Sequence, residues 1–468
     1  MYHRDDIIAA IATPIGEGGI AIVRLSGKSA IKIADAGFSG KQALEDAASH
    51  TVHHGWYRDK EKNFIDEIVA TVYLSPNSYT GEDVVELSCH GGLFVVNKLL
   101  QAVLDNGGRL AEPGEFTKRA FLNGKLDLTQ AEAVADLISA RSEAAHRSSL
   151  TQLKGALSKK VKDLSDNIIN LCGLVELELD FAEEGLSVIN REQIISKIEA
   201  VIKELHTLMG TFSRAKLTKE GVKVVIVGRP NAGKSSLLNA LLERDRAIVT
   251  NVPGTTRDVI EDQITVNGIM FKIYDTAGLR NSKAKIEKEG IRRSRLQISQ
   301  ADCCLYVVDI TAKLGSGEIE EIRQIAVDYK RDKKEFLLIL NKSDQDPGSI
   351  QSSRIKQNLP MNNSLLLLSA KNKEGISNLI HEIGARFAYS QQYNWDSSYQ
   401  ITNERQLKAV VKALKYMEVA LKNVQSFRSG EIVAIDLRTA LEAMGTLLGK
   451  FTADDILATV FSRFCIGK

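Results

Sequence analysis

One glycine-rich segment of the chain has the residue types and the spacing to hold phosphate groups. It reads Gly-Arg-Pro-Asn-Ala-Gly-Lys-Ser at 228–235 and matches the pattern G-x-x-x-x-G-K-[ST]. Glycines let backbone N–H groups point at phosphate oxygens, and the start of a following helix favours negative charge. Lys234 is expected to contact the β- and γ-phosphates, and the Ser235 hydroxyl to bind Mg²⁺. The residues predicted to hold the phosphates are Asn231, Ala232, Gly233, Lys234, Ser235 and Ser236.

Two further segments could complete a magnesium site. Asp275-Thr276-Ala277-Gly278 follows the next apolar run; an aspartate there can reach Mg²⁺ through water, and the glycine N–H can contact the γ-phosphate. Between the two runs lies Gly-Thr-Thr-Arg-Asp at 254–258, in which Thr256 is expected to offer a second hydroxyl to the metal. Each motif alone is typical of a turn, but their order after a phosphate loop indicates a nucleotide site.

Two later segments predict which base is bound. Asn341-Lys342-Ser343-Asp344 follows an apolar run, and Ser369-Ala370-Lys371 follows the next one. The carboxylate of Asp344 can accept hydrogen bonds from N1–H and the 2-amino group of guanine together, and adenine lacks this donor pair. A wrong base would leave the carboxylate unpaired, which discriminates strongly. These residues therefore predict binding of GTP rather than ATP.

The expected catalytic residues differ from those of small GTPases at one position. Those proteins commonly have glutamine after D-x-x-G to orient the attacking water, whereas this chain has Leu279. Asn231 and the backbone carbonyls of 250–252 offer oxygen ligands near the bond between the β- and γ-phosphates. We hypothesise that a monovalent cation bound there does the work of an arginine finger.

These motifs require particular elements to position them. Apolar runs at 222–227, 270–274, 303–308, 336–340 and 364–368 alternate with helical patterns, which predicts a parallel sheet covered on both faces. Residues before about 123 mix strand-like runs at 20–25 and 68–74 with a helix at 93–104. Apolar residues at three- and four-residue spacing predict helices at 130–149, 150–179, 193–212, 404–420 and 435–464.

The predicted fold is multidomain: an N-terminal α+β domain, an all-α domain, and an α/β P-loop GTPase domain of Ras-like type inserted into the all-α domain. The expected boundaries are 1–123 for the α+β domain, 124–216 and 385–468 for the two parts of the helical domain, and 217–384 for the GTPase domain.

Composition sets limits on location and chemistry. The chain has 468 residues, a formal net charge of +2 and no apolar stretch near the roughly 20 residues of a membrane span, so we expect a cytoplasmic protein. The balanced charge does not indicate a protein that coats nucleic acid. Five scattered cysteines argue against a disulfide framework or a zinc site, and Cys303 and Cys304 are expected in a core.

The order of these motifs, together with Cys-Ile-Gly-Lys at 465–468, resembles the MnmE (TrmE) family of tRNA-modification GTPases. The resemblance extends to N-terminal signatures, so that it covers essentially the full length. These signatures are Ala-Thr-Pro at 12–14, Tyr-Thr-Gly-Glu-Asp at 79–83, His-Gly-Gly at 90–92, Pro-Gly-Glu-Phe at 113–116 and Asn-Gly-Lys-Leu-Asp-Leu at 123–128.

The resemblance implies a specific activity. Members hydrolyse GTP and, with an FAD-dependent subunit of the MnmG (GidA) family, add a carboxymethylaminomethyl or aminomethyl group to carbon 5 of the wobble uridine of certain tRNAs. The one-carbon unit comes from 5-formyl-tetrahydrofolate or a related tetrahydrofolate. The resemblance further implies a homodimer through the N-terminal domain, a heterotetramer with the partner, and GTPase domains that dimerise in the presence of K⁺.

The resemblance also assigns roles to single residues. Asn231, Thr250, Val252 and Thr255 match potassium-binding positions. Glu287 matches a glutamate that orients the catalytic water, and Glu289 is the alternative for this role. Without the resemblance, both residues would be interpreted as part of a solvent-exposed helix face. Arg257, in the Gly-Thr-Thr-Arg-Asp segment, is a further catalytic candidate.

The folate positions matched by the resemblance are Arg24, Glu86, Lys125 and Lys468. Arg24 and Lys125 suit the carboxylates of a folate, and Glu86 suits the amino-pyrimidine edge of the pterin. Cys465 has two readings: a role in the modification chemistry, including nucleophilic attack, or a packed thiol at a helix end. On residue type alone, each charged position is an ordinary surface charge.

Two other functions compete with this interpretation. A ribosome-assembly or regulatory GTPase would share the nucleotide motifs but would need a dedicated basic, aromatic-rich RNA module, which the sequence does not show. A folate-binding protein with a vestigial GTPase domain is disfavoured because the phosphate, magnesium and base motifs are intact.

Overall fold

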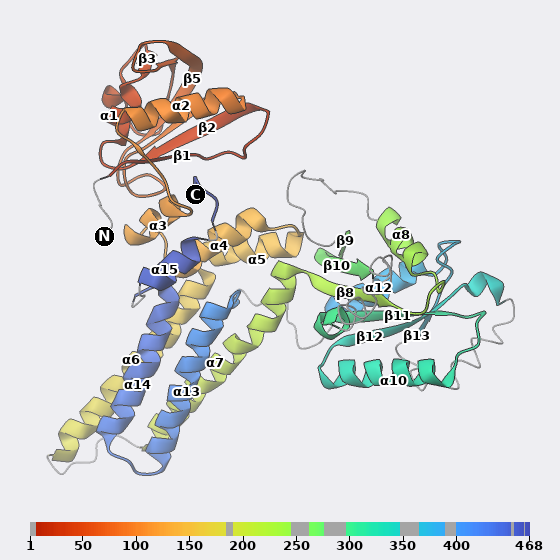
Figure 1. Ribbon diagram of the computed structural model, residues 1–468. Helices are drawn as coiled ribbons and strands as arrows, with labels where there is room; N and C mark the ends of the chain where they lie inside the picture. Colours follow the sequence, from red (N-terminus) through yellow and green to blue (C-terminus); the bar gives the residue numbers. More distant parts are fainter. Residues whose placement is uncertain are drawn as a thin grey trace, which may run out of the picture. The chain divides into compact units, whose positions relative to one another are not determined.

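The computed structural model describes residues 6–183, 191–244, 262–275, 296–346, 365–388, 399–450, 454–462 and 464–468. The chain forms two compact units (Figure 1). The first combines residues 1–139, 149–209 and 404–468, and the second combines residues 140–148 and 210–403. Each unit has hydrophobic cores of its own, and the multidomain fold class predicted from the sequence is confirmed.

The N-terminal part of the first unit is a seven-stranded sheet in the order β3-β4-β5-β6-β2-β1-β7. All neighbours are antiparallel except β1 and β7. The strands are β1 (Ile8–Ile11), β2 (Gly18–Ser26), β3 (Phe38–Gly40), β4 (Thr51–Arg58), β5 (Phe64–Tyr73), β6 (Val84–Gly91) and β7 (Arg109–Leu110). The predicted strands at 20–25 and 68–74 correspond to β2 and β5.

Helices cover one face of this sheet. They are α1 (Ala30–Asp35) and α2 (Leu93–Asp105), with a short 3-10 turn η1 (Leu44–Asp46). Alternate residues of the strands, such as Val23, Leu25 and Leu87, point into the core against Leu99 of α2. The opposite face therefore carries the other set of side chains, among them Arg24 and Glu86.

Helices form the rest of the first unit. α14 packs against α13, α6 and α4, and α13 buries Val410, Leu414 and Met417 at the expected helical spacing. Arg405 of α13 makes a two-bond contact, of 2.7 and 2.9 Å, with the Glu132 carboxylate of α4. The helices are α3 (Glu115–Leu122), α4 (Leu128–Ser139), α5 (Glu143–Leu153), α6 (Ala156–Glu183), α7 (Arg191–Glu220), α13 (Glu404–Gln425), α14 (Gly430–Leu448) and α15 (Asp454–Phe461), of which α5 and α7 continue into the second unit.

The second unit contains a six-stranded sheet in the order β13-β12-β11-β8-β10-β9, parallel except at β9. Its elements are β8 (Val222–Val227), α8 (Lys234–Arg244), β9 (Asp262–Val266), β10 (Ile269–Asp275), β11 (Cys303–Asp309), α10 (Ser316–Arg331), β12 (Glu335–Asn341), η3 (Ser343–Gln345), β13 (Leu365–Leu367) and α12 (Ile376–Ala388). The five apolar runs predicted as strands correspond to β8, β10, β11, β12 and β13; β9 was not predicted.

The continuous apolar run of β11 has a direct structural cause. Cys303 and Leu305 pack in the core shared with α8 and α12, whereas Cys304 and Tyr306 pack in the core on the α10 side. Because both faces of the strand are buried, neither set can be polar. Burial also raises the pKa of both cysteine thiols, which are core residues as expected.

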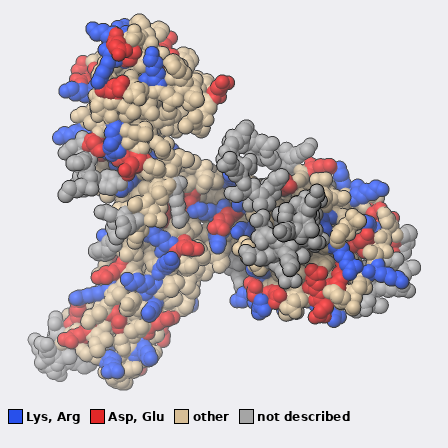
Figure 2. Space-filling model, viewed as in Figure 1, with Lys and Arg blue, Asp and Glu red and all other residues tan. Residues whose placement is uncertain are grey.

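The surface is mixed in charge. On the face that Figure 2 shows, basic and acidic side chains of the described residues are interspersed in both units, in keeping with the net charge of +2. Within the described parts of the chain, no helix is long and apolar enough to cross a membrane.

Candidate functional site

The phosphate loop follows the carboxyl end of β8 and leads into α8. Gly233, just before the helix, has φ +93°, and a Cβ there would lie 2.1 Å from Nδ2 of Asn341. Only glycine fits this position, because both the backbone angle and the close neighbour exclude a side chain. Ser235 and Ser236 are exposed in the first turn of α8, and the N-terminus of a helix favours an anion.

Lys234 is held inside this loop. Its side chain is buried, and its ammonium donates to the carbonyl oxygens of Gly228 at 2.9 Å and Arg229 at 2.8 Å. The loop therefore closes around the lysine. Its ammonium lies next to the backbone of the segment that the sequence predicts to bind phosphate. Arg229 in turn pairs with the buried Glu318 of α10 at 3.0 Å, which ties the loop to that helix.

Asn341 joins the phosphate loop to the segment at 369–371. Its Nδ2 donates to the carbonyl oxygen of Ala232 at 2.8 Å, and its Oδ1 accepts from the backbone N–H of Ala370 at 2.9 Å. The side chain is 2% exposed. One buried amide thus fixes the distance between the predicted phosphate-binding and base-binding segments.

The other base-motif residues lie beside Asn341. Asp344 accepts a hydrogen bond from the Ser369 hydroxyl at 2.5 Å and is otherwise exposed, while Lys371 is exposed. Lys342 has a left-handed φ of +67° and pairs with Asp309, the last residue of β11. Sequence reasoning missed Asp309; its place at a strand end beside the base motif is the signal that could have identified it.

Several predicted residues lie outside the described part of the chain, and nothing is stated of their arrangement. They are Thr250, Val252, Thr255, Thr256, Arg257, Thr276, Ala277, Gly278, Leu279, Glu287 and Glu289. The backbone of Asp275 is described: it ends β10, opposite Ile226 of β8.

A second polar site lies on the face of the N-terminal sheet that is opposite α2. Arg24 and Glu86 are cross-strand partners on β2 and β6, and two guanidinium nitrogens lie 2.7 and 2.8 Å from Oε1 of Glu86. The guanidinium also faces the rings of Tyr79 and Phe116, at 5.9 and 5.8 Å from their centroids.

The C-terminal residues complete this second site. Nη1 of Arg24 donates to the carbonyl of Gly467 at 3.2 Å, and the Lys468 ammonium lies 5.8 Å from the Tyr79 ring centroid. Burial lowers the pKa of Lys468, and the nearby Arg24 charge lowers it further. The structure therefore brings Arg24, Glu86 and Lys468 together, as a shared site requires.

Two other predicted residues lie close by in the same unit. Lys125 is exposed and donates to the carbonyl of Pro76 at 3.1 Å, in the same loop that carries Tyr79. Cys465 has an exposed side chain, and its carbonyl accepts from the N–H of Gly114 at 3.4 Å.

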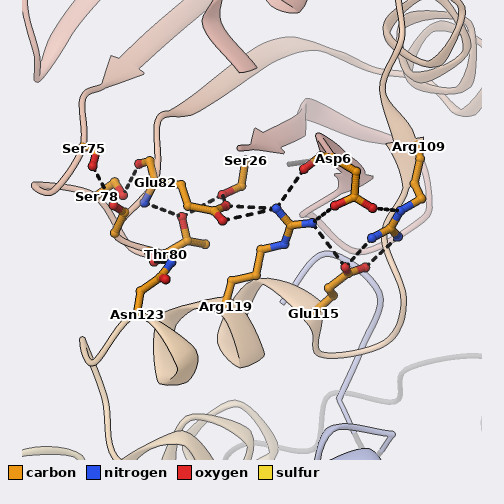
Figure 3. A network of polar contacts seen from close by, with 11 residues as sticks. Asp6, Ser26, Ser75, Ser78, Thr80, Glu82, Arg109, Glu115, Arg119 and Asn123 are labelled. Carbon is orange, nitrogen blue, oxygen red and sulfur yellow. Dashed lines mark hydrogen bonds and ion pairs between the residues drawn. The ribbon is translucent and has the colours of Figure 1, made fainter. Parts of the chain in front are cut away.

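A partly buried ionic network supports the loop that carries Tyr79 (Figure 3). Arg119 of α3 lies 2.6 Å from Asp6 and 3.1 Å from Glu82, and Arg109 lies 2.5 Å from the Glu115 carboxylate. The Ser26 hydroxyl of β2 adds a 2.7 Å bond to Glu82. Sequence reasoning did not predict this network, since its members come from five separate segments.

The family models and the full-length relatives of this chain point to one family. Residues 7–125 match the family model for the GTP-binding protein TrmE N-terminus, and residues 128–465 match that for the MnmE helical domain. The tRNA modification GTPase MnmE of Salinibacter ruber is 44% identical over 99% of this chain and 100% of the relative. That of Clostridioides difficile is 41% identical over 99% of both chains. Among solved structures, the FeoB G-domain of Methanococcus jannaschii is 25% identical over 36% of this chain and 98% of that chain, with a TM-score of 0.25. With a helical-domain match over most of its length and relatives above 40% identity from end to end, the chain belongs to the MnmE family of tRNA modification GTPases.

Proposed function

We propose that this chain binds and hydrolyses GTP in its second unit and, in doing so, serves the modification of tRNA. The observation that carries the nucleotide assignment is the Asn341 amide, which ties Ala232 of the phosphate loop to Ala370. This contact sets the phosphate segment and the base segment at a fixed separation. A nucleotide is the ligand class that needs both ends at once.

The residues present suit GTP. Gly233 permits the left-handed turn of the loop and the close approach of the Asn341 amide, Lys234 supplies a positive charge, and the start of α8 supplies N–H groups for phosphate oxygens. Asp344 is exposed apart from its Ser369 bond and can accept from the paired donors of guanine. Mg²⁺ would be held by Ser235 and Thr256, with Asp275 acting through water, and would balance the phosphate charge.

The departure at Leu279 leads to the proposal for hydrolysis. Asn231, Thr250, Val252 and Thr255 would hold K⁺ and so stimulate dimerisation of the GTPase domains. Glu287 would orient the attacking water, and Arg257 would be a second catalytic residue. These assignments rest on the motif match alone.

The second site suits a tetrahydrofolate derivative such as 5-formyl-tetrahydrofolate. Arg24 and Lys468 offer cations and Glu86 offers a carboxylate within one cluster, next to the rings of Tyr79 and Phe116. A planar heterocycle with amino groups and an acidic tail presents the complementary groups. Lys125 would add a further positive charge for the folate carboxylates. The Cys465 thiol is exposed and is available to the modification chemistry.

The proposal for the whole reaction follows the family. The relatives are named tRNA modification GTPases, and we propose the same process for this chain: addition of a carboxymethylaminomethyl or aminomethyl group to carbon 5 of the wobble uridine. The chain would act as a homodimer, in a heterotetramer with an FAD-dependent subunit of the MnmG (GidA) family, in the cytoplasm.

The test is nucleoside mass spectrometry of bulk tRNA from cells with and without the gene. We expect 5-aminomethyl-type uridines to disappear while other modified nucleosides keep their levels. An unchanged profile would overturn the tRNA assignment and would favour a ribosome-assembly or regulatory GTPase.

A further inference from the structure

We propose that Asp309 is a positioning residue for guanine-nucleotide binding, which acts by holding the side chain of Lys342. The inference rests on the proposed GTP-binding function and adds a residue that lies outside the nucleotide motifs. β11 and β12 are parallel neighbours, and Asp309 is in register with Asn341. The strand pairing therefore places the Asp309 carboxylate next to the residue that follows Asn341.

Each oxygen of the Asp309 carboxylate accepts hydrogen bonds from a different residue. Oδ2 of Asp309 accepts from the Lys342 ammonium at 2.5 Å. Oδ1 accepts from the backbone N–H of Thr311 at 2.9 Å and from its hydroxyl at 2.7 Å. The Thr311 bonds fix the carboxylate in one rotamer, so that the oxygen facing Lys342 has a defined position.

The pair also differs from an ordinary surface ion pair. The side chains of Asp309 and Lys342 are only 18% and 30% exposed. Burial opposes ionisation of Asp309, but hydrogen bonds from Lys342 and Thr311 outweigh it and lower the pKa of the carboxyl. The carboxylate is thus charged wherever a GTPase works, and water screens the pair less than at an open surface.

Asp309 completes a pattern among the residues of the base motif. Asn341 is tied to Ala232 and Ala370, Asp344 is tied to Ser369, and Lys342 is tied to Asp309. Each of the three side chains is therefore held by a partner within the protein itself. A free lysine loses much rotamer entropy when a ligand orders it, so a lysine that is already held binds with a smaller penalty.

The experiment measures the Kd of GDP for the full-length chain by fluorescence titration. The variants are Asp309→Asn, Lys342→Met and the double variant. We expect Asp309→Asn to weaken binding about three- to tenfold, the range in which ordering one long side chain contributes. In the Lys342→Met background, the same change should weaken binding by less than about twofold, because its target is gone.

Two controls separate this role from general folding. Asp328→Asn, on the exposed side of α10, makes the same chemical change away from the site and should leave the Kd unchanged. Thr311→Val removes the hydroxyl bond to Asp309 but keeps the carboxylate, and should have an effect between wild type and Asp309→Asn. Asp309→Asn could also lower the melting temperature. In that case the role of Asp309 is still judged by comparing the Kd change that Asp309→Asn causes in the Lys342→Met background with the change that it causes in the wild type.

The outcomes that overturn the inference are distinct from failure of the proposed function. An unchanged or tighter Kd for Asp309→Asn, or equal fold losses with and without Lys342, would show that Asp309 does not act through the lysine. If instead the wild-type chain binds GDP no better than Lys234→Ala, the GTP assignment itself is wrong.

Discussion

Single residues at the end of the chain complete the site on the N-terminal sheet. Arg24 and Gly467 are 443 positions apart, yet a guanidinium N–H donates to the glycine carbonyl. Gly467 is buried with φ +97°, and a Cβ there would lie 2.3 Å from the carbonyl oxygen of Ile11. The close approach of the C-terminal residues to β1 thus depends on the missing side chain.

At this scale we predict that Gly467→Ala displaces Lys468 and weakens binding of 5-formyl-tetrahydrofolate by about tenfold or more, since a strained backbone angle alone costs ~1–3 kcal/mol. Isothermal titration calorimetry measures the effect. GDP binding should keep its wild-type Kd, because those residues lie in the other unit. The matched control is Gly155→Ala, with φ +85° and no neighbour nearer than 3.6 Å; equal folate affinity of Gly467→Ala and wild type would contradict the prediction.

At the scale of elements, an ionic network joins the segment before β1, the loop between β5 and β6, and α3. Glu115 is 1% exposed and lies against Arg109 and Arg119, and Asp6 contacts the same two arginines. Buried charges are tolerated only when they are paired in this way. The loop that presents Tyr79 to Arg24 is thereby tied to α3 through Glu82.

This network predicts acid sensitivity. Burial of Asp6 and Glu115 opposes ionisation, but hydrogen bonds from the arginines outweigh it and lower the pKa of both below the ordinary 3.8 and 4.5. The folded state therefore favours the ionised carboxylates. Their stabilisation is fully present above about pH 4.5 and is lost as the pH falls through the lower folded pKa values.

Hydrogen–deuterium exchange of the segments at 6–11 and 115–122 between pH 3 and 6 measures this loss. Protection in the wild type should fall steeply below about pH 4.5. In Arg119→Met, protection should be lower at every pH and should change less with pH, because the carboxylates have lost a partner. A parallel pH profile in the two proteins would rule out the network as the cause.

At the scale of the whole molecule, the chain is divided so that each proposed site lies in one unit. All contacts among the described nucleotide-site residues, such as Asn341 with Ala232 and Lys342 with Asp309, fall within the second unit. Its two cores use only residues of the same unit. The first unit, by contrast, needs three separate segments of the chain, including its last residues.

We therefore predict that residues 210–403 expressed alone fold and bind GDP with a Kd within about threefold of that of the full-length chain. This corresponds to a difference in binding free energy of less than ~0.7 kcal/mol. Circular dichroism and GDP titration check both parts. The deleted segment at 140–148 contacts Gly268 and Gln400, which lie outside the motifs. A folded fragment with a much weaker Kd would show that the first unit contributes to the nucleotide site.

The sequence by itself determined the nucleotide motifs and most strands of the second unit. Local chemistry is the reason: a phosphate loop needs its glycines within eight residues, and a strand buried on both faces, such as β11, must be apolar throughout. β9 was missed although Asn267-Gly268, both with positive φ, is a strong hairpin signal before β10.

Only the tertiary structure decided which distant residues meet. Asp309 reaches Lys342 because two parallel strands end side by side, and Gly467 reaches Arg24 because the C-terminal residues return to the N-terminal sheet. The Arg119 network has the same origin, since its partners are up to 113 positions apart. Such contacts depend on the path of the whole chain, and a charged residue with no local partner has the same sequence signature whether it ends in solvent or in a buried pair.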